Sequence, residues 1–255
     1  MAFIEYDAKT YRNQGLFPIL RAYILYHVGV SLTPNKISCD LKGMHWSDKF
    51  KASDVTVTRY LEAMESQNEI VGLTREYVKT GASQNAELSF GKMYYLTCSE
   101  EDMVTLFRGY EFQHVVDHYD PDHEQEPDYE RMVRQTLVCQ RLLQRGGEVR
   151  SGAIIYHYCG TDKKDHKVTV PADFVVEDGL EKTVLMLSGK NTLLPLYGKA
   201  VDAHVLSAIL SLKRFAKVPV KIVAMWDREP VGEQYGKERQ ILEAVGHAVI
   251  PWNEI

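Results

Sequence analysis

The 255-residue sequence contains only four cysteines, and no two of them form a CxxC pair. They lie far apart along the chain, at Cys39, Cys98, Cys139 and Cys159. Zinc and disulfide frameworks use cysteines at short, paired spacings, so this usage favours reduced and mostly buried thiols. The sequence therefore predicts a protein of the cytoplasm, where thiols stay reduced.

The sequence also lacks a long apolar run and a strong charge of one sign. Its opening, MAFIEYDAKTYRNQ, carries acidic residues and no apolar stretch behind a basic start, so it does not resemble a signal peptide. No later stretch approaches the length of a membrane span, and we expect no membrane partner. The formal net charge is −5, so any contact with nucleic acid must use local patches.

Three helices are expected in the first third of the chain. Apolar residues recur at helical intervals over residues 15–30 and predict the first helix. Thr33 is a good N-cap and Pro34 suits the first helical position, so a second helix begins here and continues to Gly43. Ser53 is expected to cap the third helix, which carries a buried apolar stripe.

Two β-rich segments follow, IVGLTREYV and KMYYLTC, joined by the polar stretch KTGASQNAELSFG. This pattern predicts a hairpin with a long loop. Three helices followed by a two-stranded hairpin are typical of a winged helix-turn-helix. Another helix is expected over residues 102–119, and the acidic DHYDPDHEQEPD predicts a domain boundary. Residues 1–120 are therefore expected to form a winged-helix domain with flanking helices.

Residues 121–255 alternate helices and strands in the order of a restriction-endonuclease-like core. A long helix is expected over residues 129–145, with Gly146-Gly147 as its stop. Three β-rich segments follow, AIIYHYC, KVTVPADFVV and KTVLMLSGK, and EDGLE joins the last two as a hairpin. Helix AVDAHVLSAILSLKRFA, strand VKIVAMW, helix GKERQILEAVG and strand AVIPW complete the pattern. The predicted fold class is α/β, with an α+β N-terminal part and an α/β/α nuclease-like core.

Four strings resemble, in order and spacing, the C-terminal domain of a widespread group of prokaryotic AAA-type ATPases. They are TVTRYLEAMESQNEI, KMYYLT, VRQTLVCQRLLQRGGEV and VPADFVVEDGLEKTVLMLSGKN, and the similarity extends from about Phe17 to the final PWNEI. That domain is of unknown function, and the resemblance implies a nuclease fold of the PD-(D/E)XK type. The ATPases carry a P-loop domain ahead of this region, whereas this sequence has no GxxxxGK[ST] motif.

The resemblance also implies where a metal site would lie. In PD-(D/E)XK enzymes an Asp on one strand and an acid-x-Lys on the next hold Mg²⁺, which prefers carboxylate oxygens and activates water. Here Asp173 matches the first motif, and Lys190 is kept while Ser188 replaces the acid. Gln135 stands where the long helix usually supplies a second acid. Asp173 is then the one candidate metal ligand, and we expect a degenerate site without a cofactor.

An alternative keeps the enzyme active through an acid at a neighbouring position. Four glutamates are near enough in sequence: Glu130, Glu148, Glu177 and Glu181. With one of them, Asp173 and Lys190 would form an Mg²⁺-dependent DNA endonuclease. A paired Asp173–Lys190 couple with a purely structural role is equally compatible with the sequence.

Short polar and basic side chains near the start of the third helix suit phosphates and base edges in a major groove. The candidates for DNA contact are Lys49, Lys51, Ser53, Thr56, Thr58 and Arg59. The same side chains also suit a solvated helix face, because Glu62, Glu65 and Glu69 follow and reduce the positive charge. Both interpretations stay open at the level of the sequence.

The leading hypothesis is a DNA- or partner-binding regulatory protein with a degenerate, inactive nuclease-like domain. That domain would supply a docking surface or a dimer interface, so the expected partners are DNA, another protein or a second copy of the chain. The rival hypothesis is the active Mg²⁺-dependent endonuclease. A third makes the chain one subunit of a larger assembly whose ATPase is encoded separately.

Overall fold

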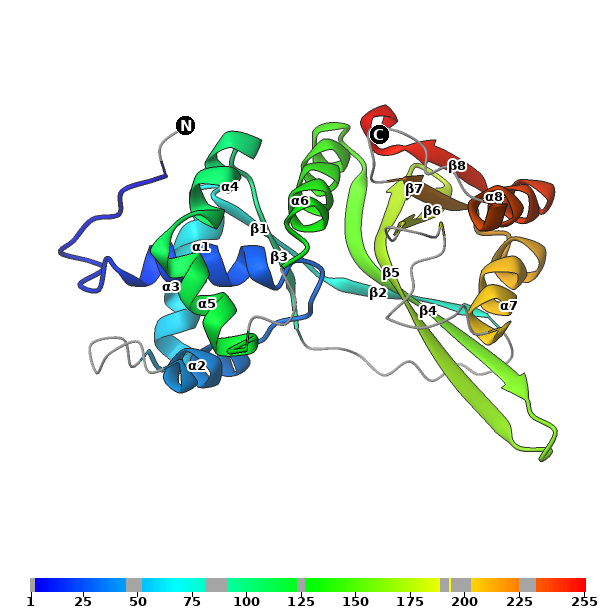
Figure 1. Cartoon of the computed structure of the whole chain (residues 1–255), viewed down its shortest axis with the longest axis horizontal. Helices are drawn as coiled ribbons and strands as arrows, with labels where there is room; N and C mark the ends of the chain where they lie inside the picture. Colours follow the sequence, from blue (N-terminus) through cyan, green and yellow to red (C-terminus); the bar gives the residue numbers. More distant parts are fainter. Residues whose placement is uncertain are drawn as a thin grey trace. The chain divides into compact units, whose positions relative to one another are not determined.

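The computed structural model describes residues 3–44, 52–80, 91–122, 127–188, 193, 203–224 and 233–255 (Figure 1). The chain is a mixed α/β protein that divides into two compact units. The first comprises Met1–Leu73 and Phe90–Leu137, and the second comprises Thr74–Ser89 and Val138–Ile255. This division differs from the expected boundary at residues 120 and 121, because the chain enters the second unit once at Thr74 and again in the middle of a helix.

The first unit begins with three helices, α1 (Leu16–Tyr26), α2 (Pro34–Gly43) and α3 (Asp54–Ser66). Both expected caps are confirmed. The Thr33 hydroxyl accepts a hydrogen bond from the Lys36 backbone N–H, and the Ser53 hydroxyl accepts one from the Thr56 N–H, each at 3.2 Å. These bonds satisfy donors that a helix cannot satisfy internally, which explains why the helices start at these residues.

The helix expected over residues 102–119 is two helices, α4 (Glu100–Phe107) and α5 (Tyr110–Tyr119). Gly109 has an extended backbone and caps α5, so the helical hydrogen-bond pattern stops at this residue. The start of α4 is fixed by a capping box, in which Ser99 and Asp102 bond to each other's backbone N–H groups. The expectation of one continuous helix was therefore wrong.

Only part of the first of the two expected strand segments pairs with the second. Strand β1 (Ile70–Leu73) pairs antiparallel with β3 (Met93–Leu96) in a two-stranded sheet. The rest of the segment IVGLTREYV belongs to a different strand, β2 (Arg75–Thr80), which joins the sheet of the second unit. The residues expected to join the strands of the hairpin lie largely outside the described residues.

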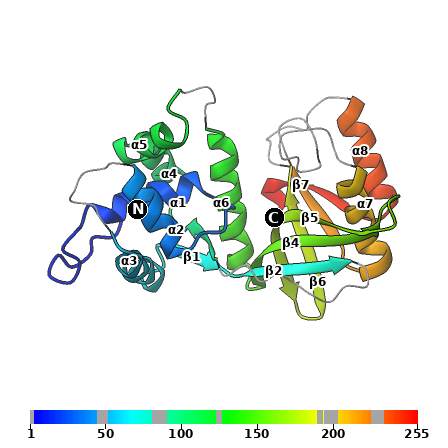
Figure 2. The same ribbon diagram turned by 90° about the horizontal axis from the view of Figure 1, so that it is seen from below.

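The second unit is built on a six-stranded sheet with the order β2-β4-β5-β6-β7-β8 (Figure 2). The remaining strands are β4 (Glu148–Cys159), β5 (Asp165–Asp178), β6 (Glu181–Leu187), β7 (Val220–Ala224) and β8 (Ala248–Pro251). Strands β4, β5 and β6 form an antiparallel meander, and the β5–β6 hairpin turns at Gly179 with a positive φ of 63°. The outer pairs β2–β4, β6–β7 and β7–β8 are parallel.

Helices α7 (Ala203–Ser211) and α8 (Glu233–Ala244) cover one face of this sheet (Figure 2). Ala208 and Ile209 of α7 and Leu242 of α8 share a buried cluster with Val184 and Ile222 of the sheet. The π-helical turn η2 (Leu212–Ala216) extends α7, and the 3₁₀ turn η3 (Trp252–Glu254) follows β8.

Helix α6 (Tyr129–Gln144) begins in the first unit, and its last turns belong to the second. In the second unit, Arg141 donates a hydrogen bond to the Trp252 carbonyl and lies 4.2 Å above the Trp252 ring. Among the described residues, no helix has both the length and the apolar character needed to cross a bilayer.

Candidate functional site

Asp173 lies at a β-bulge in the middle of β5. Ser151 of β4 pairs with Phe174 and Gly152 pairs with Ala172, so Asp173 is an extra residue without a partner position on β4. Gly152 permits this close approach, because a Cβ atom there would come 2.6 Å from the Val175 side chain. Bulges redirect a side chain and are common beside functional sites. The expected position of Asp173 within a strand is confirmed, and the bulge fixes its direction.

The Asp173 carboxylate is already engaged by the protein backbone. Its Oδ2 atom accepts a hydrogen bond from the Leu187 N–H at 2.8 Å, which ties β5 to the end of β6. The next residue, Ser188, is 4% exposed and donates its own backbone N–H to the Val223 carbonyl of β7 at 2.9 Å. The Asp173 carboxylate and the Ser188 backbone thus meet the same end of β6. Lys190 lies outside the described residues.

Gln135 belongs to the first unit, whereas Asp173 belongs to the second. Its side chain is fully buried and lies against Gly29, where a Cβ atom would come 2.4 Å from the Gln135 amide nitrogen. Gly29 also has a positive φ of 77°, so two constraints favour glycine there. The structure therefore gives Gln135 a packing role inside the first unit.

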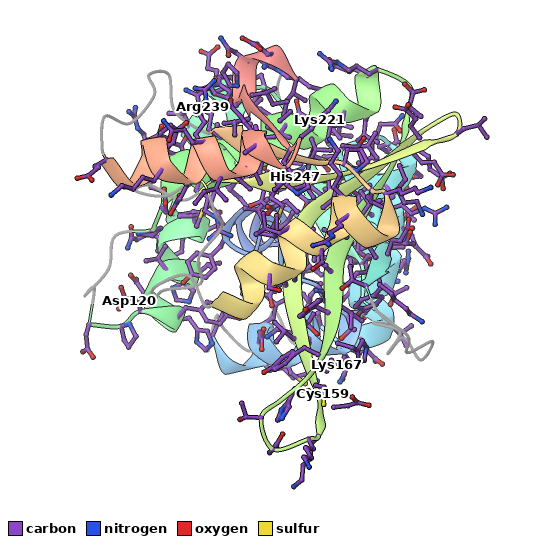
Figure 3. The ribbon with its side chains drawn as sticks, turned by 90° about the vertical axis from the view of Figure 1, so that its right-hand side faces the viewer. Asp120, Cys159, Lys167, Lys221, Arg239 and His247 are labelled. Carbon is purple, nitrogen blue, oxygen red and sulfur yellow. The ribbon has the colours of Figure 1, made fainter. Side chains whose placement is uncertain are left out.

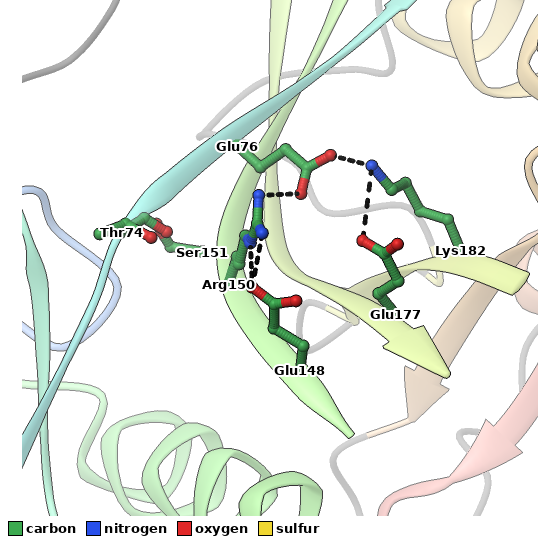
Figure 4. Close-up of polar contacts among 7 residues, drawn as sticks. All are labelled: Thr74, Glu76, Glu148, Arg150, Ser151, Glu177 and Lys182. Atoms are coloured by element: carbon green, nitrogen blue, oxygen red, sulfur yellow. Dashed lines mark hydrogen bonds and ion pairs between the residues drawn. The ribbon is translucent and has the colours of Figure 1, made fainter. Parts of the chain in front are cut away.

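Two of the four alternative glutamates, Glu148 at the start of β4 and Glu177 near the end of β5, lie in a cluster of charged side chains (Figure 4). Glu148 pairs with Arg150 at 2.5 Å, and this hydrogen bond raises the pKa of Arg150. Glu177 lies 4.0 Å from the Lys182 ammonium. Four residues of strand, about 13 Å, separate Glu177 from Asp173, so these acids do not share a site with it.

The centre of this charged cluster is Glu76, which sequence reasoning did not single out. It comes from β2, and its side chain is only 15% exposed. One carboxylate oxygen accepts from Arg150 of β4 at 3.4 Å, and the other accepts from Lys182 of β6. The cluster therefore ties together strands that are distant in sequence. The remaining two candidates, Glu130 and Glu181, are exposed.

Asp173 and Ser188 provide one carboxylate and one buried hydroxyl, whereas a Mg²⁺ or Mn²⁺ site in a nuclease uses two or more carboxylates. Within the described part of the chain, no three His, Cys, Asp or Glu side chains are grouped closely enough to hold a metal ion.

Sequence reasoning did not single out the buried acid Glu238. Glu238 of α8 is 9% exposed, and its carboxylate accepts the Leu193 backbone N–H at 2.8 Å. This hydrogen bond joins α8 to Leu193, which lies six residues after the end of β6 in the sequence. The spacing of Tyr235, Glu238 and Leu242 along one face of α8 was the signal that could have identified it.

Among the candidates for DNA contact that the structure describes at the start of α3, three are hydroxyl side chains and one, Arg59, is basic. Ser53 is occupied as the cap, and the half-buried Thr58 donates its hydroxyl to the Asp54 carbonyl at 2.9 Å. Arg59 donates to the Thr10 carbonyl and lies 5.0 Å over the Tyr11 ring. The half-buried Thr56 completes the described candidates, and Lys49 and Lys51 lie outside the described residues.

No family model matches the sequence, and no curated protein matches it. Among solved structures, the crystal structure of protein VC1899 from Vibrio cholerae aligns with 97% of this chain and 51% of that chain, at 10% sequence identity and a TM-score of 0.32. The chain thus spans about half the length of that protein. A similarity at this level carries no conclusion about function.

A pocket of about 220 Å³ lies elsewhere in the second unit. It is lined by the end of α6 at Arg145, by the β5–β6 hairpin at Asp178 and Glu181, and by Lys221 of β7. Neither Asp173 nor Ser188 contributes to it. This pocket is therefore separate from the candidate nuclease-type site.

Proposed function

We propose that this chain is a DNA- or partner-binding regulatory protein whose nuclease-like domain does not cut DNA. The proposal rests on the contacts of Asp173. Its carboxylate accepts a hydrogen bond from the Leu187 backbone N–H, and the residue after Leu187 is the buried Ser188, where the nuclease motif has an acid. Too little negative charge is present there to hold a catalytic Mg²⁺.

Binding is proposed for the first unit, where three helices precede an antiparallel strand pair in the order of a winged helix-turn-helix. DNA is the partner that we favour, because a winged helix can present its third helix to a major groove. Four free cysteines support a cytoplasmic setting, in which thiols stay reduced.

A cleavage assay tests the inactive-domain proposal. Purified protein, Asp173→Ala and the control Asp178→Ala are incubated with single- and double-stranded DNA in Mg²⁺ or Mn²⁺. Asp178 lies at the end of the same strand, so it controls for the loss of an acid from β5. We expect no cleavage by any of the three proteins. Metal-dependent cutting that only Asp173→Ala abolishes would contradict the proposal.

DNA binding is measured on the same sample across a range of salt concentrations. A protein that binds through phosphate contacts releases counterions, so its affinity must fall steeply as salt rises. Binding without salt dependence, or no binding, would favour a protein partner over DNA.

The active endonuclease remains the second candidate because of the bulge at Asp173. A bulge directs a side chain away from the strand pairing, as expected beside an active site. In this candidate, Asp173 and Lys190 act with a relocated glutamate and a bound Mg²⁺. The cleavage assay above separates it from the first.

A further inference from the structure

Strands β4 and β5 extend beyond the rest of their sheet as a two-stranded ribbon (Figure 1). Pairing of β2 with β4 ends at Tyr156, and pairing of β6 with β5 starts only at Phe174. Pairing between β4 and β5 themselves continues to Cys159 and Asp165. We call residues 157–167 the β4–β5 arm; Figure 3 labels Cys159 and Lys167 on its two strands.

The base of the arm is anchored to the second unit. The Thr80 hydroxyl of β2 donates to the Ile155 carbonyl at 3.1 Å, and the Ser207 hydroxyl of α7 donates to the Tyr156 hydroxyl at 3.3 Å. From this base a ladder of stacked rings runs along one face of the arm. Tyr156 lies 6.0 Å from Tyr158, and Tyr158 lies 5.3 Å from His166. An isolated two-stranded hairpin is marginally stable in water, and these contacts stabilise the arm.

The turn at the tip is also well defined. The Lys163 N–H donates to the Gly160 carbonyl at 3.0 Å, and Lys163 itself has a positive φ of 60°. The Gly160 N–H also donates to the Lys164 carbonyl at 2.9 Å, so residues 161–163 form a three-residue loop whose last residue is left-handed. The Asp162 carboxylate accepts the Lys164 N–H at 3.0 Å and contacts the His166 ring at 2.9 Å. The arm therefore keeps a defined shape up to its tip.

The charge at the tip differs in sign from that of the whole chain. The arm carries three lysines, Lys163, Lys164 and Lys167, and two aspartates, Asp162 and Asp165, which gives +1 in a chain of formal net charge −5. All three lysines are exposed. The hydrogen bond with His166 lowers the pKa of Asp162 and directs this carboxylate back onto the arm. Asp165 is exposed as well, so the tip presents three ammonium groups beside the carboxylates of Asp162 and Asp165 and is positive on balance.

We propose that the β4–β5 arm enters the major groove of duplex DNA and that its lysines contact the phosphates. The major groove of B-DNA admits a two-stranded β-ribbon and is about 8.5 Å deep. The three residue pairs of the arm beyond Tyr156 extend about 10 Å, and the loop at residues 160–164 adds to this, so the arm is long enough to reach the floor of the groove. This inference rests on the proposed DNA-binding function and adds a second contact, distinct from the winged helix.

The test compares two triple variants of the full chain. The arm variant is Lys163→Gln, Lys164→Gln and Lys167→Gln, and the control variant is Lys217→Gln, Lys221→Gln and Lys237→Gln. The control lysines are exposed residues of the same unit that lie outside the arm. Affinity for a DNA duplex is measured by fluorescence anisotropy over a series of salt concentrations, and circular dichroism checks that each variant is folded.

We expect the arm variant to lose at least about tenfold in affinity at low salt, and the slope of log K against log salt to fall by about 2 to 3. The control variant should keep the slope of the unmodified protein. An RNA duplex should show no difference between arm variant and unmodified protein, because the A-form major groove is too narrow for a ribbon.

If the unmodified protein binds duplex DNA and the arm variant binds equally well, the arm inference is wrong while the proposed function stands. If the unmodified protein binds no duplex at low salt, DNA binding itself is wrong. An arm effect on single strands that is absent on duplexes would overturn the placement in the groove.

Discussion

Replacing Asp173 should reveal whether its carboxylate is a structural hydrogen-bond acceptor. Its Oδ2 accepts the Leu187 N–H at 2.8 Å, and Leu187 is only 5% exposed, so water cannot readily replace the acceptor. A hydrogen bond to a charged group contributes about 1.5–3 kcal/mol. We therefore expect Asp173→Ala to lower the free energy of unfolding by about 2 kcal/mol. Asp173→Asn keeps an acceptor oxygen and should lose about half as much.

The measurement is urea denaturation followed by circular dichroism, with and without Mg²⁺, on both variants and on the control Asp178→Ala. The control residue lies at the exposed end of β5 and should change stability little. Adding Mg²⁺ should change the stability of neither the unmodified protein nor Asp173→Asn. Equal stability of Asp173→Ala and the unmodified protein would refute the structural role. A stabilisation by Mg²⁺ that Asp173→Asn loses would refute the degenerate site.

Three further predictions concern residues outside the nuclease-type site. Burial lowers the pKa of His27 to about 4, while its Nδ1 bonds the Tyr23 carbonyl at 2.9 Å. As the pH falls below about 6.5, the unfolded chain therefore takes up a proton on His27 before the folded chain does, so the free energy of unfolding should decrease between about pH 6.5 and 4, by about 2 kcal/mol at pH 5. In urea titrations over this pH range, His27→Gln should remove that decrease. Lys163→Gly should raise the melting temperature, because glycine adopts the left-handed backbone conformation without the steric cost of a side chain and should stabilise the folded state by up to about 1 kcal/mol. A lower melting temperature would contradict the turn geometry. Glu76→Gln should destabilise the protein by about 1–2 kcal/mol in denaturant titrations, because Arg150 and Lys182 both lose a half-buried carboxylate partner. Replacing the exposed Glu148 with Gln should change stability little. Equal losses of stability in the two variants would contradict the central role of Glu76.

Local signals in the sequence predicted many of the element boundaries. Thr33 and Ser53 cap the helices that they were expected to cap, and EDGLE forms the β5–β6 turn. These predictions succeed because a cap or a tight turn depends on a few adjacent residues. Gly109 was also a visible signal, and it separates α4 from α5 where one helix was expected.

The division of IVGLTREYV between two sheets was not predictable in the same way. Residues on both sides of Thr74 have strand character, and no proline interrupts them. Whether a strand pairs with β3 or with β4 depends on partners that are distant in the sequence. The sequence shows that a segment has β-strand propensity. The strands that lie beside it in the folded protein decide which sheet it joins.

The amino-acid sequence alone determined which chemical groups stand at the positions that the resemblance assigns to a nuclease site: a serine at 188, a glutamine at 135 and an aspartate at 173. Only the tertiary structure decided where these groups point and what they contact. The direction of Asp173 follows from a one-residue register shift against Gly152, and the alternative glutamates Glu148 and Glu177 are held by cations. Side-chain chemistry is a property of each residue, but strand register and charge pairing arise from contacts between residues that the chain brings together only when it folds.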